Sequence, residues 1–391
     1  MITIEEAYDR VLEFALTSGS QRVNYLDTLD RVLAEDIVSD MEIPPFNKAA
    51  VDGFACRKQD LKQELSIVEV IPAGEIPEKA IGKNECSRIM TGAMVPAGAD
   101  MVIMMEDTEL TQDGKVRFTR GNSNINISYR SEDLKEGDIV LKKGTLIRPQ
   151  EIAIMASVGC TNPLVTNKPD VGIISTGDEL VEPDQKPGIS KIRNSNASQL
   201  ISQVKRMGAT AHYLGITRDD RDSTYKLIYR ALKENDVVIL TGGVSMGERD
   251  YVPEVLNELG VDIKFRSIAI QPGRPTVFGI YDTKFLFGLP GNPVSSFVIF
   301  EMLVKPMLYK IMGHHHHPWN FKLPIGIDYK RSKSTRKSLL PVSITDDGLV
   351  MPVEYHGSAH IHAYAQADGI IAIEIGETKI NKGDIVNVRP V

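Results

Sequence analysis

Three loops in the middle of the chain combine glycine with hydroxyl, amide and acidic side chains, a mixture that suits an anionic ligand. They are STGDE (175–179), TGGVSMG (241–247) and LPGNP (289–293), and each directly follows an apolar run. Glycine lets the backbone approach a phosphate closely, and successive N–H groups can cradle an anion. The loops therefore predict a nucleotide-type anion site. The alternative is that glycine and proline only turn strands into helices here.

Acidic side chains among these loops are candidate magnesium ligands. Asp178 and Glu179 follow the first glycine, and Asp250 follows the second glycine-rich loop. Beside a bound phosphate, carboxylates commonly hold Mg²⁺, a hard cation that prefers oxygen ligands. In the third loop, Asn292 and Pro293 suit the N-cap and first turn of a helix whose N-terminus would face the same site. The alternative for each acid is a solvated carboxylate or a helix cap.

The segment GVSMG (243–247) also matches the GxSxG pattern of a serine hydrolase, and His356 comes later in the chain as that order requires. The match is weak, because a hydrolase nucleophile sits where the strand ends, whereas Thr241, Gly242 and Gly243 intervene here. The sequence has no Walker A, GxGxxG or HExxH pattern. The anion site is therefore the favoured interpretation.

Two further features could bind ligands. Arg274 follows QPG (271–273), and an arginine there could clamp a phosphate or oxyanion or could simply lie on the surface. The histidine run 314–317 follows a predicted helix. It could bind a metal opportunistically, but an exposed interdomain linker is the favoured interpretation.

The elements that must position these loops alternate between strand and helix. Apolar runs predict strands at 171–175, 211–216, 236–240 and 285–289, and helical periodicity predicts helices at 196–207, 222–235, 252–260 and 293–312. Such alternation is typical of a mostly parallel sheet covered by helices, in which ligands bind beyond the carboxyl ends of the strands. A further helix is predicted at 3–17, where Thr3 and Glu6 have capping-box spacing.

The pattern changes along the chain suggest four parts. Residues 1–45 and 147–169, with a helix at 150–158 that ends at Gly159, form an N-terminal linking domain. Short β-like runs between turn residues mark 46–146 as a β-rich insert. Residues 170–313 form the α/β domain, and 319–391 return to short strands and form a small C-terminal β domain.

Composition excludes several classes of protein. The 391 residues are 42% hydrophobic, which supports a core of normal size and excludes a disordered chain. The 45 basic and 52 acidic residues give a net charge of −7, which argues against a general binder of nucleic acid or anionic membranes. Three scattered cysteines, an acidic N-terminus and the absence of a long apolar run lead us to expect a cytoplasmic protein.

Taken together, the motifs resemble the molybdopterin molybdenumtransferase family, the MoeA type, which also forms the C-terminal domain of gephyrin. The resemblance extends along essentially the whole chain and depends on the order and spacing of several motifs. These are PPF (44–46), VDGFA (51–55), RIMTGA (88–93), Pro96, Gly98, Ala99, Asp100, Glu106, STGDEL (175–180), NSN (194–196), the loop 241–250 and LPGNP (289–293).

This resemblance implies a fold, an activity and partners. The implied molecule combines a doubly wound α/β domain with a β-rich insert and a small C-terminal β-barrel-like domain, and it works as a homodimer. The implied reaction is the Mg²⁺-dependent insertion of molybdate into adenylylated molybdopterin, with release of AMP. The upstream molybdopterin adenylyltransferase is a further implied partner. Since the dithiolene sulfur atoms of the pterin hold the metal, no protein cysteine is required.

The resemblance also suggests roles for individual residues. Asp178, Glu179 and Asp250 would hold Mg²⁺ and act in catalysis, together with Asp52, which the insert of one subunit would bring towards the site of the other. The remaining candidates would bind the pterin nucleotide or the oxyanion; they are Thr91, Thr176, Gly177, Asn196, Gly242, Gly243, Ser245, Pro272, Gly273, Arg274, Pro290, Gly291, Asn292, Arg336 and Ser358.

Some positions depart from the family pattern. Ala49 and Val51 stand where many members have Ser and Met, and QPGR (271–274) and Ser267 replace lysines that are implicated in the family's anion site. The segment YHGSAHIH (355–362) is also unusual, and its His356 and His360 could donate to an anion if protonated. These departures leave three alternatives: a rearranged oxyanion site, a non-catalytic protein that binds the pterin nucleotide, or an enzyme that inserts tungstate.

Overall fold

The computed structural model describes residues 1–218, 220–243 and 251–391, which form two compact units. Unit 1 comprises Met1–Glu35, Lys143–Pro149 and Asn162–Val391, and unit 2 comprises Asp36–Lys142 and Gln150–Thr161. Across the described ranges, no helix has both the length and the apolar character that a membrane span needs.

A six-stranded sheet forms the centre of unit 1. Its strand order is β16-β13-β17-β21-β20-β18, with the first four strands parallel and the last two antiparallel to their neighbours. The four parallel strands match the predicted ones, whereas the antiparallel pair at one edge is not predicted by the apolar runs. The bounds are β13 (Asp170–Thr176), β16 (Thr210–Thr217), β17 (Val237–Thr241), β18 (Asp262–Phe265), β20 (Val277–Tyr281) and β21 (Lys284–Leu289).

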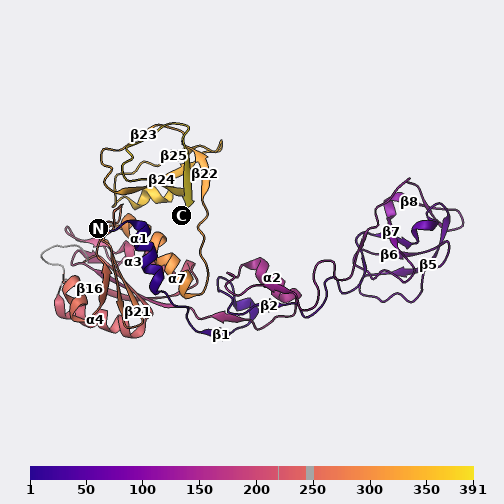
Figure 1. Ribbon diagram of the computed structural model, residues 1–391, viewed down its shortest axis with the longest axis horizontal. Coiled ribbons are helices and arrows are strands. Elements are labelled where there is room, and N and C mark those ends of the chain that lie inside the picture. The colour runs from indigo at the N-terminus through magenta and orange to yellow at the C-terminus, as the bar shows by residue number, and fades with distance from the viewer. Residues whose placement is uncertain (219, 244–250) are drawn as a thin grey trace. The chain divides into compact units, whose positions relative to one another are not determined.

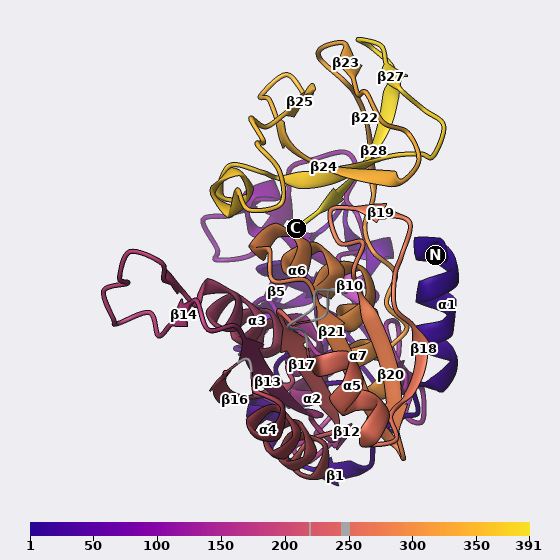
Figure 2. The same cartoon turned by 90° about the vertical axis from the view of Figure 1, so that its left-hand side faces the viewer.

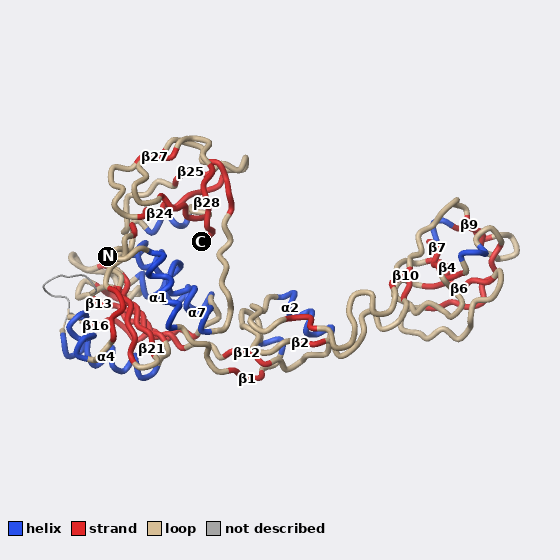
Figure 3. The backbone as a smooth tube through the Cα atoms, in the orientation of Figure 1, coloured by secondary structure: helices blue, strands red, loops and turns tan. Residues whose placement is uncertain are grey.

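Helices cover both faces of this sheet, because alternate residues of each buried strand point to opposite sides. Ile173 and Ile239 pack into one cluster with α1, α3, α6 and α7, whereas Ile174 and Leu240 pack into another with α4 and α5. Figures 1 and 3 show α4 on one side of the strands and α1 and α7 on the other. The expected doubly wound arrangement is confirmed. The bounds are α1 (Ile4–Phe14), α3 (Ser195–Arg206), α4 (Arg221–Glu234), α5 (Val252–Glu258), α6 (Pro293–Ile299) and α7 (Lys305–Ile311).

Two helices differ in length from the prediction. The capping box of α1 is present, with Thr3 and Glu6 bonding each other's backbone N–H groups, but the helix ends at Phe14 because Ala15 is extended. The predicted helix at 293–312 is α6 and α7 joined by a π-helical turn, Phe300–Val304. Pro306 has no N–H to donate within α7, which accounts for a change of hydrogen-bond register just before it.

A second sheet closes the C-terminal part of unit 1. Its strand order is β19-β24-β26-β28-β22, and β25 pairs with β24. Strand β19 comes from the α/β region and runs parallel to β24, beside it in Figure 2. The bounds are β19 (Ile270–Gln271), β22 (Phe321–Pro324), β23 (Tyr329–Lys330), β24 (Lys337–Ile344), β25 (Val350–Pro352), η5 (Ile361–Ala365), β26 (Gly369–Ile373), β27 (Lys379–Ile380) and β28 (Ile385–Pro390).

Short strand pairs complete unit 1. Strand β1 pairs with β12, and β14 pairs with β15. The second pair projects from the segment between β13 and α3. The bounds are β1 (Ser20–Arg22), η1 (Tyr25–Asp27), β12 (Leu164–Thr166), β14 (Leu180–Val181) and β15 (Ile192–Arg193).

Unit 2 is built on a sheet of order β7-β4-β6-β5-β9-β8, with two short strand pairs and one helix. Cys56 and Cys86 face each other across β4 and β6 as free thiols. Burial raises the pKa of each to about 12, so both stay protonated and inert. The bounds are β2 (Ile37–Val38), β3 (Lys48–Ala49), β4 (Gly53–Cys56), η2 (Lys58–Asp60), β5 (Glu64–Ile71), β6 (Glu85–Ile89), β7 (Met101–Met104), η3 (Met105–Asp107), β8 (Thr108–Leu110), β9 (Val116–Phe118), β10 (Ile127–Ser128), β11 (Ile139–Leu141) and α2 (Pro149–Ser157).

Candidate functional site

A cavity of about 460 Å³ lies at the carboxyl ends of three parallel strands of unit 1. Thr176 ends β13, Thr241 ends β17, and Gly291 follows β21, so the three glycine-containing loops meet at one edge of the sheet. This is the edge at which open α/β sheets bind their ligands. The lining residues are Thr176, Glu179, Leu180, Ile192, Arg193, Asn194, Ser195, Asn196, Thr241, Gly242, Gly291, Asn292, Pro293, Ala359, Ile361 and His362.

Asn196 ties the loops together from the first turn of α3. Its Nδ2 donates to Thr241 Oγ1 at 2.8 Å and to Gly291 O at 2.7 Å. The side chain is 9% exposed, so both amide hydrogens are used in a largely dry setting. Asn196 therefore fixes the ends of β17 and β21 relative to α3.

Asn194 holds the start of α3 against the sheet. Its Oδ1 caps the helix by accepting from Ala197 N at 3.2 Å and also accepts from Ser175 Oγ at 3.1 Å. Its Nδ2 donates to the hydroxyl of Tyr213 at 2.9 Å, and that hydroxyl donates to Glu182 Oε1 at 2.8 Å. Burial and the Glu182 carboxylate both raise the pKa of Tyr213 well above its ordinary value, so the phenol remains a donor.

The backbone comes close to the cavity where glycine permits it. Gly242 has φ of +87°, and a Cβ there would lie 2.4 Å from the carbonyl oxygen of Thr176. Thr176 itself is 6% exposed, and its Oγ1 is buried with no hydrogen-bond partner among the described residues. A buried hydroxyl without a hydrogen-bond partner is costly, which suggests that a ligand oxygen accepts a hydrogen bond from it.

The C-terminal part of unit 1 closes one side of the cavity. Asn292 Nδ2 donates to Ser358 Oγ at 2.9 Å, and Val294 N donates to Ser358 O at 3.1 Å. Phe297 of α6 packs edge-on against Tyr364 of η5, with ring centroids 5.1 Å apart. These contacts bring Ala359, Ile361 and His362 into the lining, and the rings of His356, His360 and His362 follow one another at centroid distances of 4.9 and 6.2 Å.

Two of the three acidic candidates for magnesium binding lie among the described residues. Glu179 lines it, and Asp178 lies next to it in the chain, with Lys191 Nζ donating to the carbonyl oxygen of Asp178. Asp250 and Ser245 fall outside the described residues. Within the described ranges, no group of three or more His, Cys, Asp or Glu side chains is arranged to hold a metal ion.

The structure sorts the remaining candidates by position. Thr176, Glu179, Asn196, Gly242, Gly291 and Asn292 line the cavity, and Ser358 bonds to it through Asn292. Gly177 and Pro290 adjoin lining residues in the chain, and Thr241 Oγ1 approaches Pro290 O at 3.5 Å. Gly243, Pro272, Gly273, Arg274 and Arg336 do not line it. Arg336 and the 272–274 segment flank the paired strands β24 and β19, a separate junction.

Asp52 and Thr91 belong to unit 2. Asp52 Oδ1 accepts from the backbone N–H of Thr91 at 2.6 Å and from its hydroxyl at 2.7 Å. The backbone N–H first, then the hydroxyl, hold the pKa of Asp52 below its ordinary value. The carboxylate is therefore ionised and its orientation is fixed.

Several lining residues were not among the candidates. Ile192, Arg193 and Asn194 come from β15 and the turn into α3, and the N-cap position of Asn194 was a usable signal before the apolar periodicity of α3. His362 reaches the cavity from the far end of the chain. The predicted histidines were His356 and His360, because no local pattern shows which histidine faces the α/β domain.

An α/β domain with a cavity at the strand ends, a β-rich insert and a C-terminal β part define a class of multidomain ligand-binding protein, and comparison with known proteins gives the family. Residues 2–159 match the family model described as MoeA N-terminal region (domain I and II). Residues 172–310 match a "Probable molybdopterin binding domain", and residues 327–391 match MoeA C-terminal region (domain IV).

Full-length relatives give the same result. A molybdopterin molybdenumtransferase of Staphylococcus epidermidis is 35% identical over 99% of this chain and 95% of its own, and one of Staphylococcus aureus is 34% identical over the same shares. Two crystal structures of a molybdopterin biosynthesis MoeA protein from Pyrococcus horikoshii match the whole chain. One match covers 100% of both chains, with a TM-score of 0.85 and 28% identity. The other covers 100% of this chain and 99% of the matched chain, with a TM-score of 0.79 and 31% identity.

The chain belongs to the MoeA-type molybdopterin molybdenumtransferase family. It is a transferase of molybdenum cofactor biosynthesis.

Proposed function

We propose that the chain inserts molybdate into adenylylated molybdopterin in a Mg²⁺-dependent reaction that releases AMP. The observation that carries the proposal is the cavity at the ends of β13, β17 and β21, whose wall contains the unpartnered hydroxyl of Thr176. A substrate with a phosphate bridge supplies the acceptor that this hydroxyl lacks. Gly242 and Gly291 line the same wall and carry no side chain there.

The described residues divide the work of binding. Thr176 Oγ1 donates to a phosphate oxygen, and the tie made by Asn196 keeps the Gly291 loop in place so that little ordering is needed when the ligand arrives. His362 and Ile361 cover the ligand from the C-terminal side. The residues thus bind, orient and partly shield the phosphate bridge from water.

The acids fit a magnesium ion of the kind that binds with a phosphate. Mg²⁺ commonly uses only one or two carboxylates and takes its other ligands from water and substrate phosphates. Glu179 lines the cavity and Asp178 is its neighbour, so the described residues supply such a pair. The ion would neutralise the charge that develops on the phosphate as AMP leaves. Asp250, outside the described residues, is a third candidate.

Assembly and setting are part of the proposal. We propose a cytoplasmic homodimer in which Asp52 and Thr91 of one subunit complete the site of the other. The fixed, ionised carboxylate of Asp52 supports this, because its two bonds to Thr91 orient it without any contribution from a ligand. The adenylylated substrate would come from the molybdopterin adenylyltransferase that acts before this chain.

The decisive experiment is a turnover assay with purified protein, adenylylated molybdopterin and Mg²⁺. Molybdate and tungstate are titrated separately, and AMP release is measured by chromatography. Release that depends on molybdate is the expected result. AMP release only with tungstate would mean that the chain inserts tungsten and not molybdenum. Tight nucleotide binding without AMP release would favour the non-catalytic alternative and contradict the proposed activity.

A pair of threonine variants tests the cavity itself. Thr176→Val removes a hydroxyl that has no hydrogen-bond partner among the described residues, so we expect unchanged stability. AMP binding should be about 10- to 150-fold weaker, the loss of one hydrogen bond to a charged group. Thr224→Val is the control, since Thr224 on α4 is also buried, but its hydroxyl bonds the hydroxyl of Thr217 and the carbonyl oxygen of Arg218. It should lower stability and leave AMP binding intact. Equal AMP affinity in both variants would contradict the role of Thr176.

A further inference from the structure

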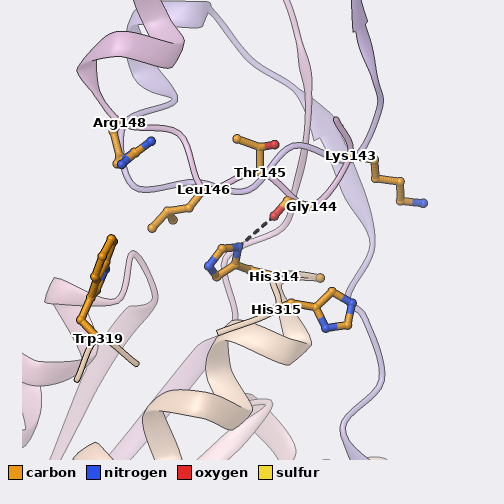
Figure 4. A pocket seen from close by; sticks show the side chains of 9 residues that line it. Lys143, Gly144, Thr145, Leu146, Arg148, His314, His315 and Trp319 are labelled. Atoms are coloured by element: carbon orange, nitrogen blue, oxygen red, sulfur yellow. Dashed lines mark hydrogen bonds between the residues drawn. The ribbon is translucent and has the colours of Figure 1, made fainter. Parts of the chain in front are cut away.

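A second cavity, of about 690 Å³, lies elsewhere in unit 1, between the segment 143–148 and the segment 313–319 (Figure 4). It is larger than the cavity at the strand ends and shares no lining residue with it. The proposed transferase activity leaves it unexplained. Its lining residues are Lys143, Gly144, Thr145, Leu146, Arg148, Gly313, His314, His315 and Trp319.

Two glycine turns and a histidine build one wall. Gly144 and Gly313 both have positive φ, and a Cβ on Gly144 would lie 3.0 Å from the carbonyl oxygen of Gly313. His314 Nδ1 donates to Gly144 O at 2.9 Å, and Tyr309 packs edge-on against the imidazole at a centroid distance of 5.1 Å. The ring of His314 is therefore held in one orientation before any ligand arrives.

Trp319 forms the opposite wall. It is the only tryptophan of the chain, and it is 78% exposed. Figure 4 shows its indole across the cavity from the imidazole of His314, with Leu146 between and above them. A large aromatic ring exposed beside a cavity is a stacking platform for a flat ligand, because a ligand that stacks on the ring removes its apolar face from water.

Basic side chains line the cavity. Its titratable lining residues, Lys143, Arg148, His314 and His315, are all basic, and no carboxylate lines it. Trp319 also borders a smaller cavity of about 150 Å³ that contains further basic side chains, namely Arg206, Lys305, His316 and Arg389.

Lys305 in this smaller cavity is paired with Glu301 at 2.8 Å. Burial, followed by the charges of Lys305 and Arg389, lowers the pKa of His316 to about 4. His316 is therefore neutral near pH 7, and the guanidinium groups of Arg206 and Arg389 carry the positive charge on this side of Trp319 that attracts an anion.

We propose that this cavity is a second ligand site, distinct from the transferase site, that binds a nucleotide. The base stacks on the indole of Trp319 and contacts the imidazole of His314, and the phosphate faces the basic side chains of the rim. Its volume falls within the range of pockets that hold ligands of this size. The ligand must carry both a flat ring and a negative charge, so ligands that carry only one of the two test the arrangement.

The single tryptophan gives a direct readout, because Trp319 lines this cavity and does not line the cavity at the strand ends. The full-length protein is titrated with AMP, adenosine and ribose 5-phosphate. We expect saturable quenching by AMP, weaker quenching by adenosine and none by ribose 5-phosphate. The absence of saturable quenching by AMP, or equal effects of AMP and ribose 5-phosphate, would overturn the proposal.

Variants in the histidine run separate stacking from a general loss of charge. His314→Ala should raise the Kd for AMP about 3- to 10-fold, the effect of losing one ring contact. His314→Phe, which retains a flat ring, should restore most of the affinity. His317→Ala is the matched control, because His317 is exposed and lines neither of the two cavities that Trp319 borders. Equal Kd values for His314→Ala and His317→Ala would refute the stacking arrangement.

Thr176→Val keeps this proposal separate from the proposed function. The substitution changes the cavity at the strand ends and not the one beside Trp319. The Trp319 titration should therefore be unchanged in this variant. A loss of quenching there would mean that AMP acts from the strand-end cavity, and would overturn the second site while leaving the transferase proposal standing.

Discussion

Replacing Asn196 by alanine tests whether its amide holds the candidate site together. Nδ2 makes two hydrogen bonds, to Thr241 Oγ1 at 2.8 Å and to Gly291 O at 2.7 Å, in a side chain that is 9% exposed. A typical hydrogen bond contributes about 0.5–1.5 kcal/mol net, so the variant should lose about 1–3 kcal/mol locally. Asn196→Asp should lose more, because it sets a carboxylate against a carbonyl oxygen.

Hydrogen exchange measures this loss where it occurs. The amide of Gly242 donates to Leu289 O at 3.1 Å between the two loops that Asn196 joins. A local loss of about 1–3 kcal/mol corresponds to exchange about 5- to 150-fold faster at this amide. AMP should also bind more weakly, because the loops must be ordered on binding. Asn257→Ala, an exposed asparagine on α5, is the control. Exchange and AMP affinity equal to those of that control would refute the reasoning.

Two further substitutions have defined outcomes. Gly242→Ala should destabilise unit 1 by more than about 2 kcal/mol and abolish AMP release, because the added Cβ would lie 2.4 Å from the carbonyl oxygen of Thr176. Gly260→Ala is the control: Gly260 has a similar φ but open space around it, so this variant should lose only about 1 kcal/mol. Equal melting temperatures for the two variants would contradict the clash. Thr91→Val should raise the depressed pKa of Asp52, measured by NMR titration of its carboxyl carbon. Because folding lowers the pKa of Asp52, its ionised carboxylate stabilises the folded state fully at pH values above its pKa in the unfolded chain. That stabilisation is lost as the pH falls through its pKa in the folded chain. An unchanged pKa of Asp52 in Thr91→Val would exclude the hydroxyl as a cause of the shift.

The central sheet could be predicted because its signals are local. A parallel strand buried on both faces is a continuous apolar run, so 171–175 and 236–240 were recognised without any knowledge of their neighbours. The convergence of the loops after them followed from the rule that parallel strands end at the same edge. The structure brings Thr176, Gly242 and Gly291 to one cavity, while their roles in binding stay predictions.

Other features depend on contacts that no local pattern records. Strands β18 and β20 carry mixed burial and pair antiparallel at the sheet edge, so neither gave a clear periodic signal. The entry of His362 into the cavity depends on the bonds of Ser358 to Asn292 and Val294, across more than sixty residues of chain. Asp250 and Ser245, which the motifs single out, lie outside the described residues and stay predictions.

The pairing of β19 with β24 has a consequence for how the chain can be divided. The C-terminal sheet takes its edge strand, Ile270–Gln271, from the α/β region, more than sixty residues before its partner Lys337. A chain cut in the linker near residue 318 would leave β19 without its neighbour and the remaining sheet with a bare, aggregation-prone edge. The α/β region and the C-terminal sheet therefore share a strand, and we expect them to be inherited, expressed and unfolded together.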